Sequence, residues 1–196
     1  MTSILESKTA PVVYKEHIDA LSDLTLEQVY HDIQPLFVDH VDAPRKEIWF
    51  ADKEYTYGSG RGRRTYPPTP MNACASMGRI MPAVNGELFK LGGSAWRVNS
   101  CFVNCYDTQH QHLGWHADDS PEMDDSQPIA IWTIGAERKI AFRPKGVKGE
   151  AHDELLLNSN SLVVMLPGMQ LEWDHKIPKH WEPCGPRISF TFRNLI

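Results

Sequence analysis

The segment from Arg187 to Arg193 alternates strictly between polar and apolar side chains, and it constrains the fold more than any other stretch. Successive side chains of a β-strand point to opposite faces, so the pattern predicts a strand with one apolar and one polar face. The apolar face carries Ile188, Phe190 and Phe192, which we expect to pack into a core. The polar face carries Arg187, Ser189, Thr191 and Arg193.

The two arginines of this strand indicate an anionic ligand. An unpaired buried charge is costly, so arginines on the inner face of a half-buried strand require anionic partners. A dicarboxylate would satisfy both. The six steps between Arg187 and Arg193 span about 20 Å of strand, and long side chains leaning inward could close that gap on a five-carbon diacid.

A second strand is predicted between Arg97 and Tyr106, with Phe102, Asn104 and Tyr106 on one side. An amide and a phenol on that side can donate hydrogen bonds to carboxylate oxygens. Cys101 and Cys105 fall on the opposite face, where small buried thiols are expected. The four cysteines show no Cys-x-x-Cys pair and no zinc spacing, and reduced thiols fit the cytoplasm.

The pattern His-x-Asp occurs three times, at His17 to Asp19, His40 to Asp42 and His116 to Asp118. In an extended strand His116 and Asp118 point to the same side, so they can present one nitrogen and one oxygen to a single ion. His175 lies in a stretch with strand character and can meet the pair from across a barrel. Two histidines and one carboxylate leave iron(II) with open positions for a co-substrate and dioxygen.

Short predicted strands fill the chain from Ser94 onward, at residues 96–106, 129–134, 139–143, 154–157, 161–166, 171–177 and 188–193. This spacing indicates a double-sheet barrel. Thr25 and Gln28 fit a capping box that starts a helix, and residues 71–91 predict two further helices, the second starting at Pro82. Residues 1–24 show no clear period, and we expect a lead-in that packs late or partly frays. The fold class is therefore α+β, mainly β.

Together these residues resemble the AlkB family of iron(II)- and 2-oxoglutarate-dependent dioxygenases. The match covers residues 45–196 and consists of Asn104-x-Tyr106, His116-x-Asp118, His175, and Arg187-x-Ser189 followed by Thr191-Phe192-Arg193. The resemblance implies a double-stranded β-helix, or jelly roll, with N-terminal helices backing the sheet. It implies that His116, Asp118 and His175 hold Fe(II), that Arg187, Ser189 and Tyr106 bind the far carboxylate of 2-oxoglutarate, and that Arg193 and Asn104 bind the carboxylate beside its keto group.

The resemblance also implies an activity. Such an enzyme uses O2 and 2-oxoglutarate to hydroxylate an N-methyl carbon of a base in DNA or RNA, and the product releases formaldehyde. A base inside a duplex cannot reach an enclosed pocket, so the substrate is single-stranded or has a flipped base. Two alternatives stay open: the same chemistry on a modified pyrimidine, a protein side chain or a small metabolite, and a binding module that has lost turnover.

The segment before the barrel carries the expected substrate contacts. Tyr55, Tyr57 and Tyr66 interleave with Arg61, Arg63 and Arg64, which offers flat faces for base stacking and charge for phosphates. The alternative is a solvated basic loop with tyrosines folded over a core. By resemblance, residues 45–70 form a nucleotide-recognition lid, with Arg45 and Tyr66 on the substrate side. Arg138 belongs to a second basic region and is a further candidate.

One position departs from the family. Two residues past the metal-binding Asp, AlkB repair enzymes place an acidic residue facing the target base, whereas this chain has Ser120. Ser120 is therefore a substrate-side candidate. Glu122 or Asp119 could take the acidic role, or the preferred base differs.

The whole chain of 196 residues predicts one domain, divided into a lead-in and helix (1–44), a lid (45–70), supporting helices (71–93) and a catalytic core (94–196). The net charge of −5 argues against coating nucleic acid through bulk electrostatics but permits a local basic groove. Charged residues interrupt the first twenty positions, so we expect no signal peptide or membrane span, and a cytoplasmic monomer.

Overall fold

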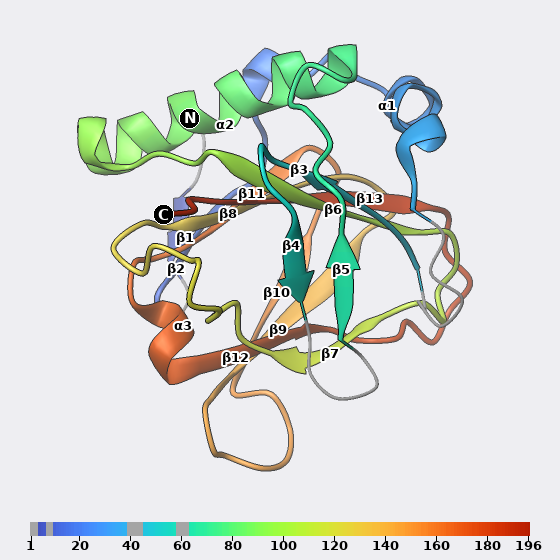
Figure 1. The fold of residues 1–196 in the computed structure, drawn as a ribbon. Helices are drawn as coiled ribbons and strands as arrows, with labels where there is room; N and C mark the ends of the chain where they lie inside the picture. Colours follow the sequence, from blue (N-terminus) through green and yellow to red (C-terminus); the bar gives the residue numbers. More distant parts are fainter. Residues whose placement is uncertain (1–3, 7–9, 39–44, 58–62) are drawn as a thin grey trace.

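Two antiparallel β-sheets face each other and form the body of the protein (Figure 1). The computed structural model describes residues 4–6, 10–38, 45–57 and 63–196. Within them, the larger sheet has the strand order β1-β2-β11-β8-β13-β6-β3 and the smaller sheet the order β10-β9-β12-β7. A separate hairpin, β4-β5, lies beside the opening between the sheets. This is the predicted jelly roll.

The strands of the larger sheet are β1 (Ile4–Glu6), β2 (Val12–Lys15), β3 (Lys46–Phe50), β6 (Ser100–Tyr106), β8 (Ile129–Gly135), β11 (Ser161–Met165) and β13 (Arg187–Arg193). Those of the smaller sheet are β7 (Leu113–His116), β9 (Arg138–Pro144), β10 (Asp153–Leu157) and β12 (Trp173–Ile177). The hairpin consists of β4 (Tyr55–Tyr57) and β5 (Arg64–Tyr66). The helices are α1 (Leu26–Ile33), α2 (Ala75–Gly92) and α3 (Met169–Glu172), with short 3-10 turns η1 (Asp19–Leu21), η2 (Gln34–Leu36) and η4 (Gly93–Ala95).

The helices α1 and α2 cover the outer face of the larger sheet (Figure 1). The apolar face of β13 packs against them, because Ile188, Phe190 and Phe192 are all buried in the core cluster that includes Val29 of α1 and Ile80 of α2. This confirms the prediction that the apolar side chains of the alternating segment pack into a core. Its polar face must point between the two sheets, where the site lies.

Helix α1 begins with the predicted capping box. The backbone N–H of Gln28 donates to the Thr25 hydroxyl at 3.2 Å, and the N–H of Thr25 donates to the Gln28 side chain at 3.0 Å. The prediction of two helices within residues 71–91 is wrong, because α2 runs unbroken through Pro82. Pro82 lies on the exposed side of α2, and the packing of the buried face of the helix offsets the hydrogen bond that proline removes.

The described part of residues 1–24 contains two strands that the sequence did not predict. Strand β1 pairs with β2, and β2 pairs with β11 at the edge of the larger sheet. Val12 and Tyr14 alternate with half-buried neighbours, so the strand is real but too short to show a clear period. The predicted strand over 171–177 also begins later, at Trp173, because residues before it form α3.

The predicted lid at residues 45–70 also needs a correction. Its first part is β3, which pairs with β6 and is an integral strand of the larger sheet. Only the β4-β5 hairpin stands apart, and it packs over Trp49 and Phe102. None of the helices in the described part of the chain is both long and apolar enough to cross a membrane.

Candidate active site

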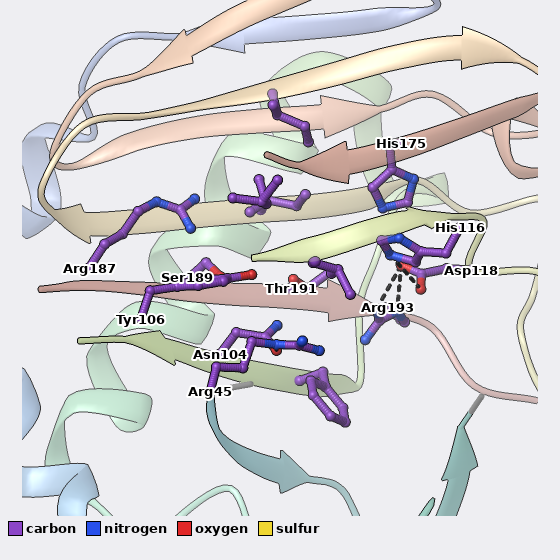
Figure 2. A pocket seen from close by; sticks show the side chains of 15 residues that line it. Arg45, Asn104, Tyr106, His116, Asp118, His175, Arg187, Ser189, Thr191 and Arg193 are labelled. Atoms are coloured by element: carbon purple, nitrogen blue, oxygen red, sulfur yellow. Dashed lines mark hydrogen bonds and ion pairs between the residues drawn. The ribbon is translucent and has the colours of Figure 1, made fainter. Parts of the chain in front are cut away.

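The three predicted metal ligands converge on one point between the sheets (Figure 2). Strands β7 and β12 pair so that His116 and His175 lie directly opposite each other, with ring centroids 4.1 Å apart. Asp118 follows the end of β7 and is 1% exposed. One ligand atom from each of the three lies within 4.8 Å of the others, which confirms the predicted convergence.

Backbone contacts fix the orientation of two of these ligands. Nδ1 of His116 lies 2.8 Å from the carbonyl oxygen of Gly114, so it is the N–H that donates there and Nε2 keeps its lone pair. Nε2 faces Oδ1 of Asp118 at 3.9 Å. The backbone N–H of Asp118 donates to the side chain of Gln170 at 2.9 Å, which holds the segment after β7.

The protonation states suit a metal. Burial lowers the pKa of His116, and it lowers the pKa of His175 to about 3 with help from His116, so both imidazoles are neutral at neutral pH. Burial alone would raise the pKa of Asp118. The charge of Arg193, the two histidines and the hydrogen bond from Arg193 together outweigh burial, and the pKa falls to about 2, so the carboxylate is ionised.

A buried anion beside two neutral imidazoles fits a divalent cation. Arg193 donates to Oδ2 of Asp118 from Nη2 at 2.7 Å and from Nε at 3.1 Å. In the described part of the chain, Oδ1 of Asp118 and Nδ1 of His175 are buried without a hydrogen-bond partner. Such atoms are rare in native proteins. Two histidines and one carboxylate are the ligand set of non-haem iron(II) oxygenases, so the residues fit the metal.

The other end of the cavity fits a carboxylate. Arg187 lies opposite Tyr106 in the β13-β6 pair, far from the ligand cluster (Figure 2). Arg187 is fully buried, and neither its guanidinium nor the Tyr106 hydroxyl has a hydrogen-bond partner among the described residues. Burial lowers the pKa of Arg187 to about 10, so the group stays cationic at neutral pH.

One cavity, lined by residues from both ends, connects them. Ser189 and Asn104 lie opposite each other along it, and Thr191 lies between Ser189 and Arg193. Thus the structure brings the residues expected at both carboxylates of 2-oxoglutarate into one cavity. Thr191 had been placed on this face by the alternation, but the sequence assigned it no role.

Two residues predicted to contact the substrate, Arg45 and Tyr66, are buried, and Arg45 lines the cavity. The Nε–H of Arg45 donates to Oδ1 of Asn104 at 2.5 Å, so Arg45 is held at the co-substrate residues. Tyr66 is buried and packs edge-on against Phe102, with centroids 4.9 Å apart. Tyr55 also lies in this core. For Tyr55 and Tyr66 the alternative interpretation holds: they fold over a core.

Other substrate-side residues remain near the surface. The hydroxyls of Ser120 and Tyr55 lie 3.1 Å apart, which joins the hairpin to the segment that carries Asp118. Arg63 is exposed and Arg64 is half-buried at the hairpin. Tyr57 lies in β4, but its side chain, like all of Arg61, lies outside the described part of the structure.

Arg138 does not fit a nucleic-acid contact. It is 1% exposed, and its Nη2 donates to the carbonyl oxygens of Gln111 at 2.9 Å and Pro178 at 2.6 Å. A guanidinium whose donors are turned toward backbone carbonyls inside the protein cannot reach a phosphate. The sequence suggested otherwise because Arg138 is flanked by a charged stretch.

A second His-x-Asp pair lies away from the site, and the third is not among the described residues. His17 and Asp19 lie 4.0 Å apart on the surface, and His40 and Asp42 lie outside the described residues. Sequence reasoning missed Glu47 and Gln170, which contact Arg45 and Asp118. Neither residue carries a spacing signal, because the contacts form between strands and segments far apart in the chain.

A jelly roll with a buried two-histidine, one-carboxylate cluster and a pair of interior arginines defines an oxygenase of the iron(II) and 2-oxoglutarate class. The model of the 2OG-Fe(II) oxygenase superfamily matches residues 20–193. A solved structure, "The structure of OsALKBH1", matches with a TM-score of 0.60 and 14% identity, over 99% of this chain and 100% of that chain. That likeness supports the fold.

Sequence similarity to curated relatives indicates the family within this class of oxygenases. The human alpha-ketoglutarate-dependent dioxygenase alkB homolog 3 is 25% identical over 199 residues, which cover 98% of this chain and 60% of that protein. The mouse DNA oxidative demethylase ALKBH2 is 29% identical over 160 residues, or 78% of this chain and 62% of that protein. The chain therefore spans about three fifths of the length of these relatives. It belongs to the 2OG-Fe(II) oxygenase superfamily and, within it, to the AlkB family.

Proposed function

We propose that this protein is an Fe(II)- and 2-oxoglutarate-dependent dioxygenase that oxidatively demethylates N-alkylated bases in DNA or RNA. The products are the repaired base, formaldehyde, succinate and CO2. The observation that carries the proposal is the single cavity that joins the cluster of His116, Asp118 and His175 to Arg187. The mouse relative is named a DNA oxidative demethylase, which supports the choice of target.

His116, Asp118 and His175 would hold the metal, and Arg187 with Tyr106 would hold the far carboxylate of 2-oxoglutarate. When bound, iron(II) and 2-oxoglutarate couple the reduction of dioxygen to decarboxylation of the co-substrate and hydroxylation of a methyl carbon. The residues of this chain orient the bound groups and exclude water from the site. Arg193 keeps Asp118 ionised and fixed, while apolar residues such as Ile131 and Ile177 line the cavity and exclude water.

Asp118 and His175 are buried, so we infer that the target base must leave a helical stack to reach them. Arg63 and Arg64 lie at the surface of the hairpin, where a nucleic-acid backbone could pass. We further propose a monomer that works in the cytoplasm, and its four free cysteines are consistent with a reducing compartment.

Mass spectrometry of oligonucleotides provides the test. Single-stranded DNA and RNA carrying N-methylated bases would be incubated with the protein, iron(II) and 2-oxoglutarate. We expect loss of the methyl group and an equimolar yield of succinate. His116→Ala should abolish both, while His17→Ala, which alters a second His-x-Asp pair at the surface, should retain them. Unchanged oligonucleotides with wild-type protein that binds both metal and 2-oxoglutarate would contradict the proposed target.

A different target of the same chemistry is the second candidate. It is favoured by Ser120, which pairs with Tyr55, and by Asp119, whose carboxylate lies 2.6 Å from Nζ of Lys145. Neither therefore presents a free negative charge to a cationic methylated base. Conversion of 2-oxoglutarate to succinate without any change in the oligonucleotides would favour this candidate, and no conversion at all would favour a binding module.

A further inference from the structure

We propose that Glu47 is a positioning residue for 2-oxoglutarate. It holds Arg45 against Asn104, and so determines which end of the Asn104 amide faces the cavity. This inference rests on 2-oxoglutarate as the co-substrate of the proposed function. It does not depend on which methylated target the enzyme uses.

The sheet register places Glu47 at the site. Strand β3 pairs with β6 so that Glu47 lies opposite Asn104. Asn104 faces the cavity, and Arg45, two residues before Glu47, lies on the same face of the strand and lines the same cavity. Glu47 is 1% exposed. A buried carboxylate is costly unless it is paired, so losing one of its contacts destabilises the protein more than losing a contact of a surface glutamate.

Both oxygens of this carboxylate contact functional elements. Oε1 lies 2.7 Å from Nη2 of Arg45. Oε2 accepts a hydrogen bond from the Tyr66 hydroxyl at 2.6 Å. Tyr66 belongs to β5, so Glu47 joins the larger sheet to the hairpin beside the opening of the site.

Arg45 passes this constraint to Asn104. Its Nε–H donates to Oδ1 of Asn104 at 2.5 Å, and its Nη1 donates to the carbonyl of His112 at 3.2 Å. An amide side chain has one accepting oxygen and one donating NH2 group. With its oxygen taken by Arg45, Asn104 is left to offer its NH2 group, which is the end that a carboxylate of 2-oxoglutarate requires. Figure 2 shows the two side chains next to each other below β13.

The simpler role for Glu47 is neutralising a buried arginine. That role predicts lower stability but unchanged affinity for the diacid in protein that remains folded. The positioning role predicts a specific loss of affinity, because Arg45 without its anionic partner can turn away from Asn104 and allow the amide to reorient.

Calorimetric titration of 2-oxoglutarate into Mn(II)-loaded protein separates the two roles. Glu47→Gln keeps the size of the side chain but removes its charge and one of its two acceptor oxygens. We expect about tenfold weaker binding of 2-oxoglutarate, as for other residues that orient a ligand-binding group, and unchanged binding of Mn(II) alone. Glu87→Gln is the matched control. Glu87 is also buried and pairs with Lys15 and Lys90, but on α2, outside the sheets.

Tyr66→Phe removes one hydrogen bond to Glu47 and keeps the buried ring. We expect it to weaken 2-oxoglutarate binding by about threefold, again with unchanged Mn(II) affinity. Wild-type affinity in both variants would overturn the proposal, as would an equal loss in Glu87→Gln. If Glu47→Gln fails to fold, wild-type affinity in Tyr66→Phe overturns it alone. The titration contains no nucleic acid. The measured affinity for 2-oxoglutarate therefore tests the role of Glu47 even if the protein does not demethylate nucleic acid.

Discussion

At the scale of single residues, Arg187 carries a buried charge that suits ligand binding but lowers the stability of the ligand-free protein. Its guanidinium is buried in the cavity wall, and burial holds its pKa down to about 10. No hydrogen-bond partner for it exists in the described part of the protein. A charge in this position destabilises the protein without ligand and becomes favourable only when an anion occupies the cavity.

Arg187→Met should therefore raise stability and abolish co-substrate binding. Methionine has a similar length and no charge, so we expect a gain of about 1–4 kcal/mol in the free energy of unfolding of the ligand-free protein. Affinity for 2-oxoglutarate should fall at least a hundredfold. Urea denaturation and calorimetry measure the two effects. Arg143→Met, which breaks an ion pair with Asp174, is the control and should leave 2-oxoglutarate binding unchanged.

The metal-binding histidines predict how stability depends on pH. Burial lowers the pKa of His175 from 6.5 to about 3, and it also lowers that of His116. Below pH 6.5 the unfolded chain takes up protons that the folded protein does not, so stability must fall as the pH drops from about 6.5 toward 3.

Urea denaturation of metal-free protein between pH 7 and pH 4 measures this dependence. His175→Gln cannot titrate at this position, so its stability should decline less steeply with falling pH. If the free energy of unfolding depends on pH equally in the wild type and the variant, His175 is not held neutral in the folded protein.

At the scale of elements, the strands with strict alternation were predictable from sequence. The alternation in β13 predicted a polar face and an apolar face, and in the structure the polar side chains line the cavity while the apolar ones lie in the core. Strand β2, which lies between β1 and β11, was not predictable, because its four residues are too few to establish a period. The continuity of α2 was missed because Pro82 is a strong helix breaker, whose cost other contacts of the helix offset.

Pro82 gives a prediction at this scale. Proline removes one helical hydrogen bond and crowds the carbonyl four residues earlier. Since Pro82 is exposed, Pro82→Ala loses little packing, and we expect it to stabilise the protein by about 1–3 kcal/mol in thermal or urea denaturation. Gly86→Ala is the comparison, because a Cβ there meets open space. A gain no larger than that of Gly86→Ala would mean that Pro82 is not strained.

The site itself was only partly predictable. The ligand cluster and the arginines follow from residue types and spacing, which a family pattern preserves. The contacts of Arg45 with Glu47 and Asn104 depend on the pairing of β3 with β6, which the local sequence does not specify. The local sequence also does not predict that Arg138 is buried, because its guanidinium donates to backbone carbonyls of residues distant in the chain.

At the scale of the whole molecule, the net charge of −5 means that the proposed nucleic-acid substrate must be attracted by a local basic surface. Single-stranded oligonucleotides should bind with an affinity that falls steeply with salt, because phosphate contacts release counterions. Replacing Arg63 and Arg64 by alanine should weaken binding and reduce the slope of log affinity against log salt concentration. Fluorescence anisotropy at several salt concentrations measures both quantities.

The control for this prediction removes the same charge elsewhere. Arg79 and Lys90 lie on α2, which covers the outer face of the larger sheet (Figure 1), so their double replacement by alanine should leave binding unchanged. An equal loss in both double variants would indicate attraction by overall charge. Absence of binding at low salt would contradict a nucleic-acid substrate.

The central claim is that one cavity holds a divalent metal at His116, Asp118 and His175 and a keto diacid that extends from it to Arg187. A crystal structure with Mn(II) and 2-oxoglutarate tests this most directly. We predict metal coordinated by those three side chains, the far carboxylate of the diacid hydrogen-bonded to Arg187, and its other carboxylate near Asn104. Metal bound elsewhere, or a diacid that leaves Arg187 without an anionic partner, would contradict it.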